Sequence, residues 1–318
     1  MTAIRRTGKI NADTTLIDFN LNGATGIGAV YLIESEEKLL IDCGTRTEAP
    51  GIVKILRGLK SFPPDKIVFT HSHDDHCQGI HIIRREARRE HKDISVLASH
   101  AAVPLLEDQS WQKAKDIRDV SPISEGDAID IGGLVLRVIE VPGHSDDSIA
   151  LLDERNENLF VGDSLGYKFG DKAFVPPFIP PWWDTDAFCR SMEKIKRITY
   201  RGIGLAHFGY IFGKEAEDMP DEAISVFQKW WRVYEQAEEH GKLDDYDYIC
   251  SIIKDEVGFS IPDVRVLRPS LRFLLKVMKI GRILSGKKPY PIDELILREF
   301  FVRWLAKGYK TYRKLGTR

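Results

Sequence analysis

A cluster of potential metal ligands constrains the fold of this chain more than any other feature. The segment Thr70-His71-Ser72-His73-Asp74-Asp75-His76 follows an apolar stretch, predicted to be a strand, and precedes a stretch with helical spacing. A loop at a strand end can turn His71 and His73 towards one ion, and Asp75 and His76 towards a second. Imidazole and carboxylate are ligands for zinc, iron or manganese. A solvated polar loop is the alternative, and the downstream residues argue against it.

Three further polar residues lie where apolar stretches end. His144 follows the predicted strand 134–140 within Pro142-Gly143-His144-Ser145, Asp163 ends Phe160-Val161-Gly162-Asp163, and His207 ends the stretch 202–206. Each alone is compatible with a structural role in a turn. Together with the first cluster they give seven candidate ligands, which suits two ions bridged by one carboxylate.

The distribution of strands and helices predicts an α/β fold with a helical C-terminal region. The spacing predicts a helix over 80–89 and, from about Glu215 onward, helices over 264–283, 292–306 and a stretch that includes Phe227 and Trp230. We therefore expect a first unit, 1–214, and a helical extension, 215–318. Strands are predicted at 16–21, 30–35, 39–42, 66–70, 95–98, 134–140, 149–153, 158–161 and 202–206.

Composition restricts the setting of the protein. The 318 residues carry a net charge of −2, which selects neither nucleic acid nor membrane. No apolar run follows Arg5, Arg6 and Lys9, and no stretch is long enough to span a membrane. The four cysteines form no CxxC pair, which favours a reducing, cytoplasmic location, and Cys77 is expected to be a small buried side chain.

The motif HSHDDH resembles the HxHxDH signature of the metallo-β-lactamase superfamily. The similarity extends in order over Asp42-Cys43-Gly44, His144, Asp163 and His207, about the first 210 residues. It implies a four-layer αβ/βα sandwich with two divalent metal ions at one edge. His71, His73 and His144 would hold the first ion, Asp75, His76 and His207 the second, and Asp163 would bridge them. Zinc is favoured, with iron and manganese as alternatives. Asp42 would orient a ligand histidine, although a turn aspartate before Gly44 fits equally well.

Two comparisons within that superfamily refine the expected activity. Redox members have a glutamate where this chain has His73, so hydrolysis is favoured over electron transfer. The runs PGHSDDS and FVGDSLG and the helical extension resemble the quinolone-signal response thioesterase and its relatives, whereas AHFG departs from the usual GHG. We expect a dinuclear hydrolase that uses a metal-bridging hydroxide on a thioester, lactone or related ester, with Asp75 as the catalytic proton acceptor.

Two alternatives remain at this stage. A phosphodiesterase or nuclease could use the same ions, but only 44 positions separate Asp163 from His207, too few for the added domain of RNA-processing members. A non-enzymatic ligand-binding regulator is the other alternative, and the complete set of ligands disfavours it. The expected partner is a small-molecule substrate, and a homodimer is compatible with the sequence.

Two segments outside the ligands also suggest roles. The Pro- and Trp-rich stretch 174–183 could form an apolar wall for the substrate or pack against the C-terminal helices, and Tyr167 or Tyr210 could donate to an oxyanion. Residues 263–318 hold 15 Lys and Arg against 4 acids, a net charge of +11 that leaves −13 for the rest. This polarity could attract an anionic substrate, RNA or a lipid surface, but contact with the acidic core or a solvated face is favoured, because no nucleic-acid motif accompanies it.

Overall fold

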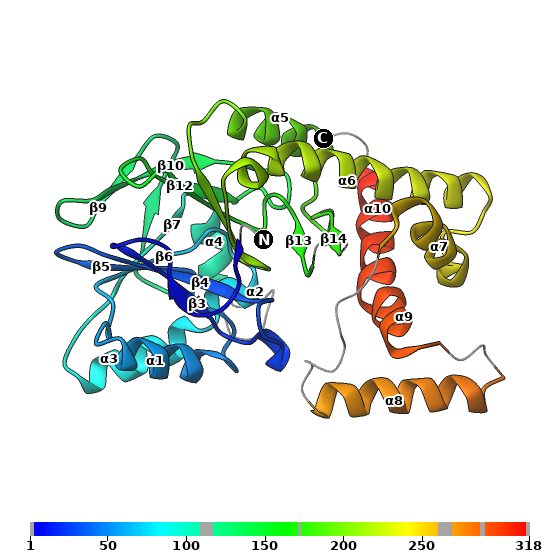
Figure 1. Ribbon diagram of the computed structural model, residues 1–318, viewed down its shortest axis with the longest axis horizontal. Helices are drawn as coiled ribbons and strands as arrows, with labels where there is room; N and C mark the ends of the chain where they lie inside the picture. Colours follow the sequence, from blue (N-terminus) through cyan, green and yellow to red (C-terminus); the bar gives the residue numbers. More distant parts are fainter. Residues whose placement is uncertain (1–2, 109–116, 171–172, 260–268, 287–289, 316–318) are drawn as a thin grey trace.

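A computed structural model describes residues 3–108, 117–170, 173–259, 269–286 and 290–315. Two seven-stranded sheets face each other in it, and helices cover both outer faces (Figure 1). The result is the predicted αβ/βα sandwich. None of the helices in these ranges combines the length and apolar character needed to cross a bilayer.

The first sheet is built from the N-terminal third of the chain. Its order is β2-β3-β4-β5-β6-β7-β8, with antiparallel pairing from β2 to β5 and parallel pairing from β5 to β8. The strands are Gly8–Lys9, Thr14–Asp18, Ala29–Glu34, Lys38–Ile41, Lys66–Val68, Ser95–Ser99 and Val120–Ile123.

The second sheet combines the extreme N-terminus with the middle of the chain. Its order is β1-β16-β15-β12-β11-β10-β9, and only β12 and β15 pair in parallel. In that order the strands are Ala3–Ile4, Gly209–Phe212, Gly202–Leu205, Asn158–Gly162, Ile149–Asp153, Val135–Glu140 and Ala128–Asp130. A separate hairpin joins β13 (Tyr167–Lys168) to β14 (Phe174–Val175).

The central strands β3, β4, β11, β12 and β15 are buried on both faces, which explains their nearly continuous apolar sequences. Along β4, Tyr31 and Ile33 point into the core between the sheets, whereas Val30 and Leu32 pack under the outer helices. This alternation follows from the two-residue period of a strand. The outer helices are α1 (Ala49–Gly58), α3 (Ile80–Arg89) and α4 (Ala102–Glu107) on the first sheet, and α5 (Thr185–Ile195) and α6 (Lys214–Glu239) on the second.

The helical C-terminal region begins within the outer layer of helices on the second sheet. Its first helix, α6, begins at Lys214, one residue before the predicted start of the extension, and Met219 and Phe227 share a core with the second sheet. We propose to keep 1–214 and 215–318 as separate units, although they are joined through this core. The elements after α6 are α7 (Tyr246–Ile252), a π-helical turn (Ile253–Val257), α8 (Pro269–Leu284), α9 (Ile292–Ile296), a π-helical segment (Leu297–Val302) and α10 (Arg303–Leu315).

Several predicted boundaries differ from the structure. The strand predicted to end at Leu21 ends at Asp18, where Asn20 adopts positive φ and a 3₁₀ turn follows. The last predicted strand is followed by one more, β16, and the helix predicted over 292–306 contains the π-helical segment and continues to Leu315. The start of the helix predicted over 264–283 lies outside the described residues, which begin again at Pro269.

Candidate metal centre

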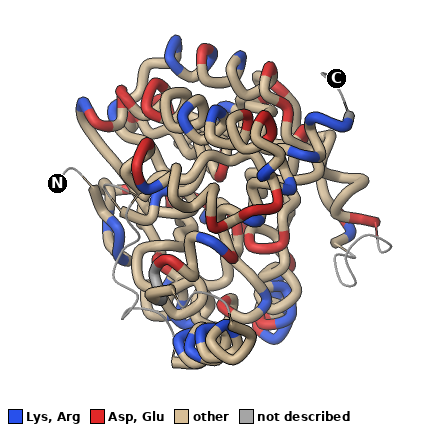
Figure 2. The backbone as a smooth tube through the Cα atoms, turned by 90° about the vertical axis from the view of Figure 1, so that its right-hand side faces the viewer, with Lys and Arg blue, Asp and Glu red and all other residues tan. Residues whose placement is uncertain are grey.

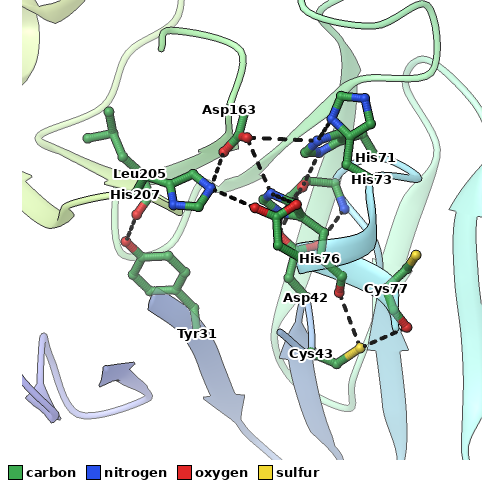
Figure 3. A network of polar contacts seen from close by, with 12 residues as sticks. Tyr31, Asp42, Cys43, His71, His73, His76, Cys77, Asp163, Leu205 and His207 are labelled. Atoms are coloured by element: carbon green, nitrogen blue, oxygen red, sulfur yellow. Dashed lines mark hydrogen bonds and ion pairs between the residues drawn. The ribbon is translucent and has the colours of Figure 1, made fainter. Parts of the chain in front are cut away.

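All seven predicted ligand residues meet at the edge of the two sheets. His71 and His73 follow β6, Asp75 and His76 lie in the one-turn helix α2 (Asp74–Cys77), and His144 lies between β10 and β11. Asp163 directly follows β12, and His207 lies between β15 and β16. Figure 3 shows the side chains from the two sheets turned towards one another. Strands end together at this edge, so residues far apart in sequence reach one place.

Three nitrogen atoms converge on the first position. His73 Nδ1 lies 2.8 Å from His71 Nε2 and 2.9 Å from His144 Nε2. The ligand atoms of these three residues all lie within 4.8 Å of one another. Three imidazole nitrogens at such separations are suited to one shared cation.

A second group lies beside the first, and one carboxylate links the two. His207 Nε2 lies 3.2 Å from Asp75 Oδ2, and His76 Nε2 lies 3.8 Å from Asp75 Oδ1. Asp163 reaches both groups, because its Oδ1 is 3.5 Å from His207 Nε2 and its Oδ2 is 3.8 Å from His144 Nε2. This is the arrangement expected of a bridging carboxylate.

The chemistry of the buried atoms fits a cation. Among the described residues, His76 Nε2, His207 Nε2 and Asp163 Oδ1 have no hydrogen-bond partner although they are buried. An unpartnered buried polar atom costs about 1–3 kcal/mol, so three in one place require an explanation. A bound cation would satisfy all three.

The opposite side of three of the histidine rings is held by the protein. Nδ1–H of His144 donates to the Pro177 carbonyl (2.9 Å), and Nδ1–H of His207 donates to the Ile27 carbonyl (3.1 Å). Nδ1 of His76 lies 2.8 Å from Asp42 Oδ2. These contacts fix the ring orientation and leave Nε2 facing the centre.

Asp42 therefore has the orienting contact that the resemblance implied. Its Oδ1 accepts from the Thr70 amide (2.8 Å) and its Oδ2 from the Thr70 hydroxyl (2.8 Å), besides the contact with His76. The backbone at Asp42 has φ of 60°, a conformation that L residues rarely adopt. The neighbouring Cys77 is fully buried, as predicted.

The pKa values of the histidines differ between the two groups of ligands. Burial and then the neighbouring histidines hold the pKa values of His71 and His73 well below the usual range, so these rings are neutral at pH 7. Burial also opposes charge on His207, but Asp163 and Asp75 outweigh it and raise its pKa to about 10. The pKa of His76 is raised well above its usual value by Asp163, Asp42 and Asp75, against the effect of burial.

Aromatic side chains border the centre on two sides. The Trp182 ring lies 5.3 Å from the His73 ring, and the Tyr167 ring lies 5.2 Å from that of His207. Burial and then the Asp163 charge raise the pKa of Tyr167, so it keeps its proton. The prediction for Tyr210 is wrong, because its hydroxyl donates to Asn158 in the core between the sheets.

The Pro- and Trp-rich stretch packs against the C-terminal helices and also reaches the metal centre. Trp182 stands against the centre, whereas Trp183 and Phe178 are buried. The Phe178 ring contacts the rings of Phe227 (6.0 Å) and Tyr234 (5.6 Å) on α6. The segment therefore connects the metal centre to the helical extension.

Sequence reasoning did not identify three supporting groups. Asp147 accepts from the Ser72 amide (2.7 Å) and so fixes the loop between His71 and His73. Its position in PGHSDDS, three residues after His144, is a signal that could have been used. The carbonyls of Pro177 and Ile27 have no such signal, because any residue supplies a carbonyl.

Two facing sheets with histidines and carboxylates buried at one edge are typical of the metallohydrolase fold. Comparison with known proteins agrees with this classification. The family model described as "Metallo-beta-lactamase superfamily" matches residues 23–197, and the chain belongs to this superfamily. A metallo-β-lactamase from Pontibacter korlensis superimposes with a TM-score of 0.55 and 17% identity, over 70% of this chain and 98% of that one. At that identity the likeness shows the fold alone.

Curated relatives match at the level of sequence. A hydroxyacylglutathione hydrolase of Rhodopseudomonas palustris (strain BisB18) is 30% identical over 143 residues, 43% of this chain and 49% of that protein. The match thus spans about half the length of that relative. A beta-lactamase-like protein 2 homolog of Caenorhabditis elegans is 22% identical over 236 residues, 72% of both chains.

Proposed function

We propose that this chain is a metal-dependent hydrolase with two divalent cations, and that its substrate is a thioester, lactone or related ester. The observation that carries the proposal is the convergence of seven ligand side chains in which His76 Nε2, His207 Nε2 and Asp163 Oδ1 are buried without hydrogen-bond partners. The name of the hydroxyacylglutathione hydrolase relatives supports thioester chemistry. The closer likeness to the quinolone-signal response thioesterase group stays a prediction.

The residues would divide between the two cations as the two groups described above suggest. His71, His73 and His144 would hold one, Asp75, His76 and His207 the other, and Asp163 would contact both. Cations bound there would supply an acidified water and a Lewis acid for the substrate carbonyl. Zinc is favoured by the nitrogen-rich set, with iron and manganese as alternatives.

Asp75 is the best placed residue to accept a proton. Its side chain is 35% exposed, whereas those of His207 and Asp163 are 6% and 2% exposed. Against partial burial, His76 and His207 lower the pKa of Asp75, so it is ionised at pH 7 and can accept a proton and exchange it with solvent. Trp182 would form an apolar wall beside His73, and Tyr167 would offer a protonated hydroxyl towards Asp163.

The test combines reconstitution with a substrate panel. Metal-free protein would be loaded with zinc, manganese or iron(II), and turnover of acyl-thioesters, lactones and bis-aryl phosphodiesters measured. We expect about two metal equivalents and thioester or lactone turnover that chelation abolishes. Loss of one ligand in Asp163→Asn should reduce turnover at least about 10²-fold.

A matched control separates the centre from general damage. His71→Ala should lose metal and activity, whereas His100→Ala, at an exposed position, should retain both. Phosphodiester cleavage with esters untouched would reverse the substrate assignment. A biological function that survives both metal removal and His71→Ala would exclude metal-dependent hydrolysis as that function.

A further inference from the structure

Helix α8 has an exposed apolar surface that the metal centre does not explain. It lies at the lower right end of the molecule, below α9 (Figure 1). Leu275 is buried with Tyr290 and Leu295, and Met278 packs against that small cluster. The Arg282 guanidinium lies 4.7 Å from the Tyr290 ring and 3.5 Å from Asp247 Oδ2. These contacts occupy one side of the helix.

The opposite side presents large apolar residues to solvent. Phe273, Val277, Ile280 and Leu284 are 68%, 46%, 55% and 83% exposed. Their spacing of i, i+4, i+7 and i+11 places them on one stripe of the helix. Leu274 and Ile283 are also exposed, so α8 carries six of the eleven exposed large hydrophobic residues in the described part of the chain. Such a concentration marks an interaction surface.

The charges beside this stripe are all positive. Arg272, Lys276, Lys279 and Arg282 are the charged residues of Pro269–Leu284, and the helix contains no Asp or Glu. Helical geometry places Arg272, Lys276 and Lys279 along one border of the stripe. Figure 2, which faces the right-hand side of Figure 1, shows blue but no red on the coil at the lower end, where α8 lies.

We propose that α8 docks the protein on the surface of an anionic lipid bilayer. A helix with an apolar stripe and a basic border lies in the interface plane, with its apolar side among the acyl chains and its basic side chains at the head groups. Sixteen residues give a length of about 24 Å, too short to span the hydrocarbon core. The helix therefore lies on the membrane.

The same charges argue against a second copy of this chain as the occupant. In an antiparallel two-fold pairing through this stripe, the basic border of one α8 would face that of the other, without an acidic residue on either helix. An anionic lipid surface instead complements Arg272, Lys276 and Lys279. The membrane proposal is independent of the proposed hydrolase activity.

The test is flotation of the full-length protein with vesicles of phosphatidylcholine alone or mixed with phosphatidylglycerol. We expect binding to the anionic vesicles that weakens with added salt. The variant Phe273→Ser/Ile280→Ser should bind at least about tenfold more weakly. Lys276→Gln and Lys279→Gln should each weaken binding to anionic vesicles about fivefold.

A matched pair of substitutions controls for general hydrophobicity. Val277 on α8 and Val135 on β10 are both 46% exposed, so Val277→Ser should weaken vesicle binding and Val135→Ser should leave it unchanged. Circular dichroism and metal content should match the wild type in all variants, because these side chains are exposed. Equal effects of the two valine changes would overturn the proposal. So would the absence of wild-type binding at low salt, or a dimer that dissociates in Phe273→Ser/Ile280→Ser without any vesicle binding.

Discussion

The edge of the sheets and the outer face of α8 differ in which side chains they bury: polar groups are buried at the edge, and apolar groups are exposed on α8. At the edge, histidines and carboxylates are buried and several face one another without hydrogen bonds, whereas on α8 phenylalanine and leucine side chains stand in solvent. Each arrangement is unfavourable for the isolated chain and becomes favourable when something binds. The comparison indicates that both regions are built for ligands of opposite chemistry, cations at one and lipid at the other.

Two adjacent tryptophans in the Pro-rich stretch allow the metal centre and the hydrophobic core to be tested separately. Trp183 is buried against Phe188 and Phe227, so Trp183→Ala should lower the free energy of unfolding by about 3–5 kcal/mol. Trp182 faces His73 and is only half-buried, so Trp182→Ala should leave stability nearly intact and raise KM for substrates with large acyl groups about tenfold. Denaturant titration and steady-state kinetics measure the two effects, and equal destabilisation by both changes would remove Trp182 from the proposed substrate wall.

The orienting role of Asp42 is testable separately from metal ligation. Asp42→Asn keeps the shape at a position with positive φ but weakens the contact with His76 Nδ1. We expect metal affinity to fall about 10–100-fold, with activity restored by excess metal. Asp130→Asn, at the exposed end of strand β9, is the control and should bind metal normally. Activity that stays low when the metal content is full would contradict a role through His76.

Two glycines distinguish the packed part of the extension from α8. At Gly308 in α10, an added Cβ would lie 2.2 Å from the Phe178 carbonyl oxygen, so Gly308→Ala should destabilise the protein by about 1–3 kcal/mol. At Gly281 in α8, a Cβ would meet nothing within 4 Å, so Gly281→Ala should stabilise the helix by about 0.5–1 kcal/mol. Thermal unfolding measures the first effect, and amide hydrogen exchange within α8 measures the second. Faster exchange in Gly281→Ala would show that α8 has contacts on that side.

Proton release on metal loading tests the difference between the two halves of the centre. His207, with its pKa near 10, and His76 are protonated at pH 7 without metal and must lose a proton to bind it, whereas His71 and His73 are already neutral. Metal binding at the second group should therefore release about one to two protons at pH 7, and its affinity should rise with pH up to about 10. Calorimetry in buffers of different ionisation enthalpy counts the protons, and a buffer-independent heat would contradict these charge states.

Local sequence predicted the elements whose physical signal is local. The helix over 80–89 matches α3, and the strand over 149–153 matches β11, because a regular apolar period is decided within the segment itself. Short edge strands such as β1 and β9 escaped prediction, since two or three residues are too few to show the period of a strand, and β1 also depends on a partner strand far along the chain. The π-helical segment in the last predicted helix also carries no sequence signal.

The sequence by itself determined which residues could bind metal and that each follows an apolar stretch, since ligand chemistry resides in the side chain and strand formation in the local pattern. Only the tertiary structure decided that those residues meet, that Asp42 holds His76, and that the carbonyls of Pro177 and Ile27 orient the rings of His144 and His207. It also decided which side of α8 remains uncovered. Contacts between distant segments depend on how sheets and helices stack, and backbone groups that are identical in every residue leave no mark in a sequence.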